Sequence, residues 1–196
     1  MNLFRFLYRV QSARLPFWDY GLPGDYFITI CTKYRVPYFG TILNGRMDLS
    51  SAGKIAAFEL TKTMKIRDNV VVDTWVIMPN HIHAIIRIKR PPDHMAGDVE
   101  THRDASLHRD ASLQHGGLNN HPVGNKNRFG PQSDNIPAIV RGFKSAVKKW
   151  TNLYGLDFQW QSRYHDHIVR DDRELERIRW YIRNNERVWG SDSLNR

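Results

Sequence analysis

The two histidines of His81-Ile82-His83 are the first feature of the chain with an evident chemical use. Side chains two positions apart on a strand project from the same face, so both imidazoles would share one face and Ile82 would point to the other. Two neutral imidazoles on one face can bind a divalent ion together and leave coordination positions open for a substrate oxygen. A pair of rings with a structural role and no metal is the alternative that this spacing leaves open.

A second pair, in His165-Asp166-His167, shows that the spacing alone is weak evidence in a chain with nine histidines. The first pair is the better candidate because apolar strand segments, Trp75 to Met78 and Ala84 to Ile88, enclose it. Two polar rings buried among apolar residues cost free energy unless they have partners. We therefore expect His81 and His83 to be the metal ligands.

Tyr181 is the candidate nucleophile, in a segment with helical spacing that runs from Arg179 to Asn185. Residues four apart are neighbours on a helix surface, so Asn185 would lie directly beneath Tyr181. A tyrosine at the edge of a buried helix face commonly packs its ring and leaves its hydroxyl in water. The alternative is attack of the phenol on phosphorus, with the Asn185 amide oxygen completing the coordination of the metal. A free phenol has a pKa of about 10, so this attack requires a cation that favours the phenolate.

Hydrophobic patterns predict the elements that must position these residues. Strands are expected over 26–32, 70–78 and 81–88, and an extended hairpin over 38–49 would turn at Asn44-Gly45. Helices are expected over 51–67, 137–152 and 172–188, the first of them capped by Ser50 or Ser51. Their core residues would be Ile55, Phe58 and Leu60; Ile139, Phe143 and Val147; and Leu175, Ile178 and Ile182. This order predicts an α+β fold, a ferredoxin-like antiparallel sheet with helices on one face and a C-terminal helix carrying the tyrosine.

The charge of the chain favours a polyanionic partner such as nucleic acid. The 29 lysines and arginines exceed the 20 aspartates and glutamates by nine, and the isoelectric point is about 9.8. From Lys89 to Asp134 acidic and basic residues balance at six each, so the whole excess lies outside that segment. A basic surface that serves only solubility is the alternative that charge alone leaves open.

The sequence also indicates a cellular compartment. Cys31 is the only cysteine, which excludes an internal disulfide and a cysteine-based zinc cluster. No stretch approaches the roughly 20 apolar residues of a membrane span, and the first residues lack a signal-peptide pattern. We therefore expect a cytoplasmic protein that does not enter a membrane.

The periodic patterns stop between about residues 91 and 132, where the hexapeptide His102 to Leu107 is repeated directly as His108 to Leu113. This stretch is far longer than the usual connection of roughly two to eight residues between elements. We therefore expect a single domain over 1–196 with a flexible insertion at 91–132.

Several blocks of residues, in order along the chain, resemble the HUH-type single-tyrosine transposases, and among these they look most like the REP-associated tyrosine transposases. The resemblance runs from about Asp19 to Trp189, apart from the insertion. The blocks are Tyr26 to Thr32 with Phe39-Gly40, Met78 to His83, Ile139 to Ser145, Trp160-Gln161, Tyr164 to Arg170, and Tyr181 to Asn185.

The resemblance implies a metal-dependent single-strand DNA endonuclease and strand-transferase. It implies a Mg²⁺ or Mn²⁺ ion held by His81 and His83, with Asn185 at the family's polar ligand position and Tyr181 as the nucleophile. The metal would act as a Lewis acid while the phenol attacks, giving a 5′-phosphotyrosine and a free 3′-hydroxyl. The family commonly has Asn-Pro where this chain has Asn185-Glu186, so the backbone that positions Asn185 can differ here.

The implied substrate is single-stranded DNA beside a small hairpin, a REP-like palindrome, bound by a monomer or a homodimer. Exposed helix faces would supply the phosphate contacts, and the candidates are Arg141, Lys144, Lys148, Arg173 and Arg177. In the family pattern the block His165 to His167 lies outside the metal pair, so it would pack or contact DNA.

Three other functions remain open from the sequence, and one of them, a structural role with neither activity, leaves the most features unexplained. A replication initiator or relaxase-like nuclease would share the histidine pair and the tyrosine, but it would place the tyrosine differently or carry further domains. A noncatalytic, ferredoxin-like nucleic-acid-binding module would explain charge and fold, and it would leave His81, His83 and Tyr181 without a chemical role.

Overall fold

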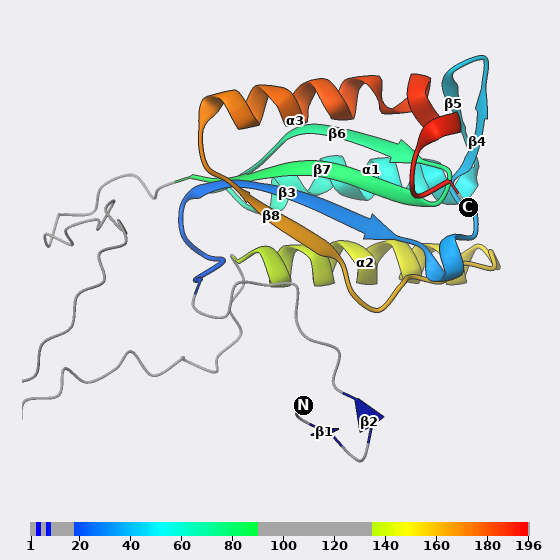
Figure 1. Cartoon of the computed structure of the whole chain (residues 1–196). Helices are drawn as coiled ribbons and strands as arrows, with labels where there is room; N and C mark the ends of the chain where they lie inside the picture. The colour runs from blue at the N-terminus through cyan, green and yellow to red at the C-terminus, as the bar shows by residue number, and fades with distance from the viewer. Residues whose placement is uncertain (1–2, 5–6, 9–17, 90–134, 196) are drawn as a thin grey trace, which may run out of the picture. The chain divides into compact units, whose positions relative to one another are not determined.

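A four-stranded antiparallel sheet forms the frame of the protein (Figure 1). The computed structural model describes residues 3–4, 7–8, 18–89 and 135–195. The strands are β3 (Gly24–Cys31), β6 (Val70–Met78), β7 (His81–Ile88) and β8 (His165–Val169), in the spatial order β6-β7-β3-β8. Each neighbouring pair runs antiparallel, so β7 and β3 lie at the centre of the sheet.

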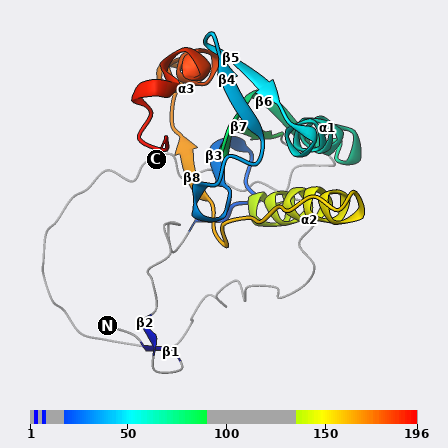
Figure 2. The same ribbon diagram turned by 90° about the vertical axis from the view of Figure 1, so that its right-hand side faces the viewer.

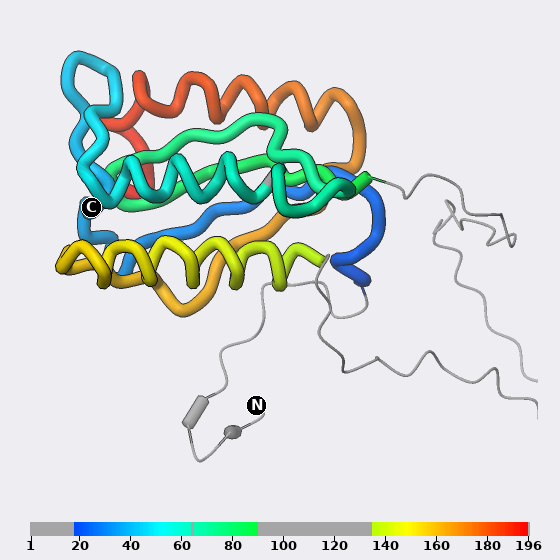
Figure 3. Tube along the Cα trace, turned by 180° about the vertical axis from the view of Figure 1, so that it is seen from behind, coloured from blue at the N-terminus to red at the C-terminus, as the bar shows by residue number. Residues whose placement is uncertain are grey.

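Three helices complete the fold: α1 (Ser51–Ile66), α2 (Ile136–Leu153) and α3 (Asp172–Asn184). The sequence of elements β3-α1-β6-β7-α2-β8 is the βαββαβ order of a ferredoxin-like fold, which confirms the α+β prediction. Figure 2 shows α1 and α2 side by side along one side of the sheet and α3 apart from them. The same pair of helices lies in front of the strands in Figure 3. The tyrosine-bearing helix thus packs on the opposite face of the sheet.

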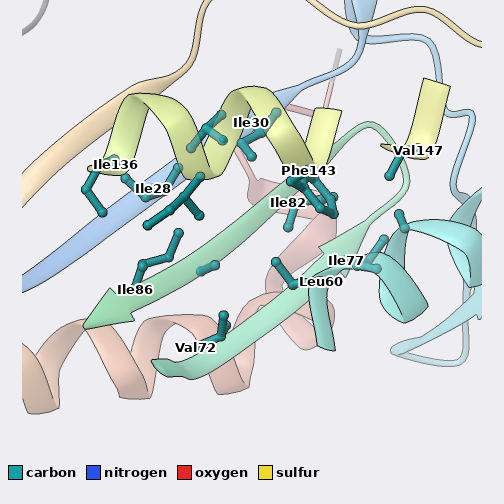
Figure 4. Close-up of a cluster of buried hydrophobic side chains, with 14 of the residues drawn as sticks. Ile28, Ile30, Leu60, Val72, Ile77, Ile82, Ile86, Ile136, Phe143 and Val147 are labelled. Atoms are coloured by element: carbon teal, nitrogen blue, oxygen red, sulfur yellow. The ribbon is translucent and has the colours of Figure 1, made fainter. Parts of the chain in front are cut away.

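The alternation of side chains along β7 separates two hydrophobic clusters. Ile82 and Ile86 join the main core under α1 and α2, where they meet Leu60 and Phe143 (Figure 4). Ile85 points the other way and packs against Leu175, Ile178 and Ile182 of α3. His81 and His83 share the orientation of Ile85 because they differ from it by an even number of residues. The sheet therefore presents both imidazoles to α3.

A separate hairpin, β4 (Gly40–Leu43) and β5 (Arg46–Leu49), lies outside the main sheet. Its turn residues Asn44 and Gly45 both have positive φ, 53° and 72°, as a type I′ turn requires. Ser50 follows the hairpin and caps α1, because its hydroxyl accepts a hydrogen bond from the Gly53 amide. Both features were predicted from the sequence. β1 (Leu3–Phe4) and β2 (Leu7–Tyr8) form a further antiparallel pair.

Two predictions differ from the structure at the level of single elements. Phe58 was expected in the core but is 62% exposed, because the buried positions of α1 follow Ala52, Ala56 and Leu60 at intervals of four. The helix predicted over 172–188 ends at Asn184 and continues as a 3-10 helix, η2 (Asn185–Ser191). A further 3-10 turn, η1 (Lys33–Arg35), follows β3.

The insertion predicted over 91–132 lies outside the described residues and stays a prediction. Within the parts of the chain that the structure describes, no helix combines the length and apolar character needed to cross a membrane.

Candidate active site

The two histidines lie at the start of β7, directly after a tight turn, and their ring centroids are 4.5 Å apart. Both are buried on the face that α3 covers. Burial, with the positive charge of Arg35, lowers the pKa of His81 to about 3. Burial, with the neighbouring His81, also lowers the pKa of His83 to about 3. Both rings are therefore neutral near pH 7, which is the form that binds metals.

Hydrogen bonds fix the tautomer of His81. The Asn80 side-chain amide donates to the Leu194 carbonyl at 2.8 Å, so its oxygen is the atom that faces His81 Nδ1, also at 2.8 Å. An amide oxygen only accepts, so Nδ1 of the neutral ring carries the proton and Nε2 carries the lone pair. That Nε2 atom is buried and has no hydrogen-bond partner. The lone pair of Nε2 thus points into the site, and the hydrogen bond from Nδ1 to Asn80 fixes the orientation of the ring.

His83 is oriented in a similar way by the neighbouring strand. Thr29 lies opposite His83 in the register of β3 and β7, and its hydroxyl is 2.8 Å from His83 Nδ1. The other ring nitrogen, Nε2, lies 3.2 Å from the hydroxyl of Tyr181. Phe27 stacks on His83 with ring centroids 5.2 Å apart and meets the Tyr181 ring edge-on at 6.3 Å. The Phe27 ring of β3, the His83 ring of β7 and the Tyr181 ring of α3 therefore pack against one another.

Asp192 is a third candidate ligand, and the sequence did not predict it. Its carboxylate oxygen Oδ2 lies 3.9 Å from His81 Nε2, and its side chain is only 4% exposed. One ligand atom each from His81, His83 and Asp192 fall within 4.8 Å of one another. The η2 turn carries the chain back over the histidines, and Trp189 of that turn packs against His81 with ring centroids 6.0 Å apart.

Tyr181 and Asn185 occupy the end of α3 that faces the histidines. Burial and the charge of Asp192 raise the pKa of Tyr181, with a smaller opposing effect from Asn185, so the phenol is protonated near pH 7. Asn185 is fully buried, and neither atom of its side-chain amide has a hydrogen-bond partner. A buried amide without well-formed hydrogen bonds costs roughly 1–3 kcal/mol, so a cation bound by its oxygen would stabilise this position.

The chemistry of these residues fits a divalent cation. His81 Nε2 and Asp192 Oδ2 are both acceptors, both buried and both without hydrogen-bond partners, yet they face each other. Two such atoms repel unless a positive charge lies between them. Two imidazoles, a carboxylate and an amide oxygen from Asn185 form a donor set that divalent transition ions accept.

Glu186 stands where the resembling family commonly has proline, and the structure shows the consequence. Asn185 adopts φ −59° and ψ −40°, a helical conformation that a following proline disfavours. The chain therefore continues without a break into η2. The Glu186 carboxylate in turn accepts a hydrogen bond from the Met47 amide at 3.2 Å, which ties the β4–β5 hairpin to the end of α3.

The basic residues predicted to contact DNA lie in two places. Arg141, Lys144 and Lys148 belong to α2, on the face of the sheet opposite Tyr181. Lys144 donates to the Gln161 carbonyl and Lys148 donates to the Phe158 carbonyl, so both ammonium groups have partners within the protein. Arg141 is exposed.

The other two, Arg173 and Arg177, lie on α3 and are exposed, and Arg177 pairs with Glu174 at 3.3 Å. The second histidine pair lies on the edge strand β8, where His167 pairs with the same glutamate at 2.9 Å. His165 and His167 therefore lie outside the cluster of His81, His83 and Asp192. A contact of any of these side chains with DNA stays a prediction.

The comparisons with known proteins place this geometry in context. No family model matches the chain. An uncharacterized protein of Haemophilus influenzae is 34% identical over 188 residues, which cover 94% of this chain and 92% of that protein.

Two solved structures are similar to the protein. A REP-associated tyrosine transposase bound to a REP hairpin has a TM-score of 0.51 and 18% sequence identity, over 89% of this chain and 72% of that chain. A proposed transposase from Deinococcus radiodurans has a TM-score of 0.37 and 14% identity, over 87% of this chain and 95% of that chain. The first likeness establishes a shared fold, and the second is too distant to support an argument.

Proposed function

This chain belongs to the same family as the Haemophilus influenzae protein, and we propose that it is a transposase of the HUH single-tyrosine type. In this proposal it acts as a metal-dependent single-strand DNA endonuclease and strand-transferase with Tyr181 as the nucleophile. The observation that carries the proposal is the 3.2 Å approach of the Tyr181 hydroxyl to His83, beside the partnerless His81 and Asp192 atoms.

His81, His83 and Asp192 would hold the metal, with the Asn185 amide as a further ligand. A Mg²⁺ or Mn²⁺ ion bound there would supply Lewis-acid stabilisation of the phosphate and a positive charge that favours the phenolate. The protein itself supplies the position of the nucleophile. Phe27 and His83 both pack against the Tyr181 ring, so little ordering of that ring remains to be done before attack.

The covalent step transfers the DNA phosphate from the 3′-oxygen of one nucleotide to the Tyr181 oxygen. The Tyr181 oxygen forms a bond to phosphorus, the bond from phosphorus to the 3′-oxygen breaks, and that oxygen leaves as a 3′-hydroxyl after taking up a proton. The products are a 5′-phosphotyrosine and a free 3′ end. A 3′-hydroxyl from another strand can reverse the step, because the phosphodiester is exchanged for a phosphotyrosine bond and no external energy source is needed.

The proposed substrate is single-stranded DNA beside a small hairpin. Three observations support it: the excess of nine positive charges, the shared fold, and the REP hairpin bound to the solved transposase of that fold. A REP-associated identity rests in addition on the sequence blocks described above. Imperfect palindromes beside the coding region would supply the natural oligonucleotides.

The test is the covalent adduct. A labelled oligonucleotide with such a palindrome and single-stranded flanks, incubated with Mn²⁺, should give a protein–DNA adduct that survives denaturing electrophoresis. Tyr181→Phe should abolish the adduct, and Tyr154→Phe, at an exposed tyrosine on the end of α2, should not. An adduct with Tyr181→Phe would overturn the assignment of the nucleophile. DNA binding without any adduct from the wild-type protein would favour the noncatalytic binding module.

A further inference from the structure

An open pocket of about 660 Å³ lies beside the candidate site. Its volume falls within the roughly 300–1,000 Å³ of typical ligand pockets. One wall is the η1 turn, and the other is the segment that leads from α2 to β8. The lining residues are Lys33, Tyr34, Arg35, Gln159, Trp160, Gln161 and Ser162.

Two hydrogen bonds, one from a backbone amide and one from the Arg35 side chain, connect this pocket to the histidine site. The amide of Thr32, which precedes η1, donates to the carbonyl of Asn80 at 2.9 Å, and Asn80 orients His81. On the far side, Arg35 donates to the carbonyl of Ser193 at 3.1 Å, next to Asp192. The pocket and the histidine site are therefore neighbours in the fold, held together through Asn80 and Ser193.

Tyr34 is the most unusual residue of the pocket. Its side chain is 85% exposed, and its backbone has φ 54°, a left-handed conformation that an aromatic residue rarely adopts. The next residue, Arg35, also has positive φ, 56°. Such backbone costs of order 1–3 kcal/mol for each residue and gathers at functional sites. The strain holds an aromatic ring out in water, where it adds nothing to the core.

The charges and polar groups of the pocket fit one unpaired nucleotide. Lys33 and Arg35 are its charged lining residues, both cationic, so the pocket favours an anion such as phosphate. Lys33 donates one hydrogen bond to Gln159, and Arg35 donates one to Ser193. Each side chain has further N–H groups that can bind a ligand. The two glutamine side chains offer both donors and acceptors to the edge of a base.

We infer that this pocket is a nucleotide subsite of the DNA-binding surface. It takes one unpaired nucleotide next to the strand at the histidines, with the base stacked on Tyr34 and the phosphate bound by Lys33 and Arg35. The inference rests on the proposed function, because that function supplies single-stranded DNA as the ligand. Base stacking on an exposed aromatic ring is the usual way in which proteins bind single strands without pairing.

The inference is tested by binding, in full-length Tyr181→Phe protein so that cleavage does not interfere. The probe is fluorescein-labelled oligothymidine of roughly 12 nucleotides, within the footprint of a single-strand-binding domain. Tyr34→Ala should raise its Kd about 5- to 150-fold, which corresponds to the loss of one stacked base. Tyr34→Phe and the control Tyr154→Ala, at another exposed tyrosine, should keep the parent Kd.

The phosphate contact has its own readout. Lys33→Ala should reduce the slope of log K against log salt concentration by about 0.7, the value for one lost phosphate contact on a single strand. Lys54→Ala, at an exposed position of α1, should leave the slope unchanged. Photocrosslinking of iodouracil-substituted oligothymidine to the protein should map to the peptide that contains Tyr34.

Three results would overturn the subsite: parent-like binding by Tyr34→Ala, no measurable binding by the parent, or crosslinks that map only to other peptides. Failure of the subsite would leave the covalent adduct of the wild-type protein intact. Failure of the proposed function would instead remove the adduct and leave the binding dependent on Tyr34. Thermal unfolding of each variant shows whether weaker binding results from loss of folding or from loss of the contact. The crosslinking experiment uses no substitution in the pocket and so does not depend on the folding of a pocket variant.

Discussion

The hydroxyl of Tyr181 lies 3.2 Å from Nε2 of His83, whereas Thr29 contacts the other ring nitrogen, Nδ1. Nucleophile and metal ligand therefore meet at a single nitrogen. His83 would hold a divalent ion through this same nitrogen, so the phenol and the ion would compete for it.

Tyr181→Phe is expected to bind Mn²⁺ at least as tightly as the wild-type protein. The substitution removes a hydroxyl that contacts His83 Nε2 and leaves the ligands in place. Isothermal titration calorimetry measures the affinity. A large loss of Mn²⁺ affinity would mean that the phenol is itself a ligand and would change the interpretation of the adduct test.

The metal site should depend on all three clustered residues. His81→Ala, His83→Ala and Asp192→Ala are each expected to weaken Mn²⁺ binding by more than about a hundredfold, since each removes one ligand of the proposed metal. His167→Ala is the matched control, because that ring lies on β8 and pairs with Glu174. Undiminished affinity in a His81→Ala/His83→Ala protein would remove the metal site from the proposal.

Thr29→Val should weaken metal binding without removing a ligand. The Thr29 hydroxyl orients His83 at 2.8 Å, and loss of such a partner typically costs about 10- to 100-fold in metal affinity. Thr63→Val provides the control, because the Thr63 hydroxyl bonds only to the backbone of its own helix. Equal affinities in the two variants would show that the hydrogen bond to His83 has no influence on the metal.

The metal-free protein should lose stability as the pH falls below about 6.5. The pKa values of His81 and His83 are about 3 in the folded protein, below the ordinary value of 6.5 that they regain on unfolding. Between these values the unfolded chain binds protons that the folded protein does not, so this stability is complete above pH 6.5 and declines as the pH falls toward 3. Each imidazole contributes up to about 1.4 kcal/mol per pH unit.

Urea denaturation in EDTA, at pH values from about 7 to 5, measures this loss in a range above the titration of ordinary carboxylates. A His81→Asn/His83→Asn variant should show a flatter dependence on pH. An equal slope in that variant would contradict the burial of neutral imidazoles.

Glu186→Ala should loosen the β4–β5 hairpin. The Glu186 carboxylate accepts the Met47 amide, and a hydrogen bond to a charged group contributes about 1.5–3 kcal/mol when it is not open to water. Faster hydrogen exchange at Met47 is the expected result, with Glu176→Ala, an exposed residue of α3, as the control. Unchanged exchange at Met47 would show that the bond is not formed in solution.

Much of the fold could be predicted because its signals are local. The β-branched and aromatic composition of 70–78 and the alternation of 81–88 predicted β6 and β7 to the residue, and the Asn44-Gly45 pair predicted the hairpin turn. The end of α3 was placed too late, because the residues after Asn184 still favour a helix and only their tertiary contacts tighten them into η2. Phe58 was misplaced because the buried stripe of α1 begins with two alanines, Ala52 and Ala56, whose small side chains give a weak hydrophobic signal.

The residues of the site also divide into those that a local pattern predicts and those that depend on tertiary contacts. The shared face of His81 and His83 follows from the two-residue period of a strand and was predicted. Thr29 depends on the register of β3 against β7, which no local pattern specifies. Asp192 depends on the return of η2 over the sheet, and a single aspartate near glycine and serine carries no signal of its own. The joining of Tyr181 to the histidines came from family resemblance rather than from spacing.

The alternation along β7 has an evolutionary consequence. A gain or loss of one residue between Val76 and His83 would turn Ile82 toward α3 and push both imidazoles into the apolar layer beneath α1 and α2. Catalysis and folding would then fail together, so the length of this segment is fixed by both. None of the site residues that the structure describes comes from the segment between Ile88 and Ile136, so the alternation along β7 places no such limit on its length. The hexapeptide repeated in that segment of the sequence follows β7 and leaves its register unchanged.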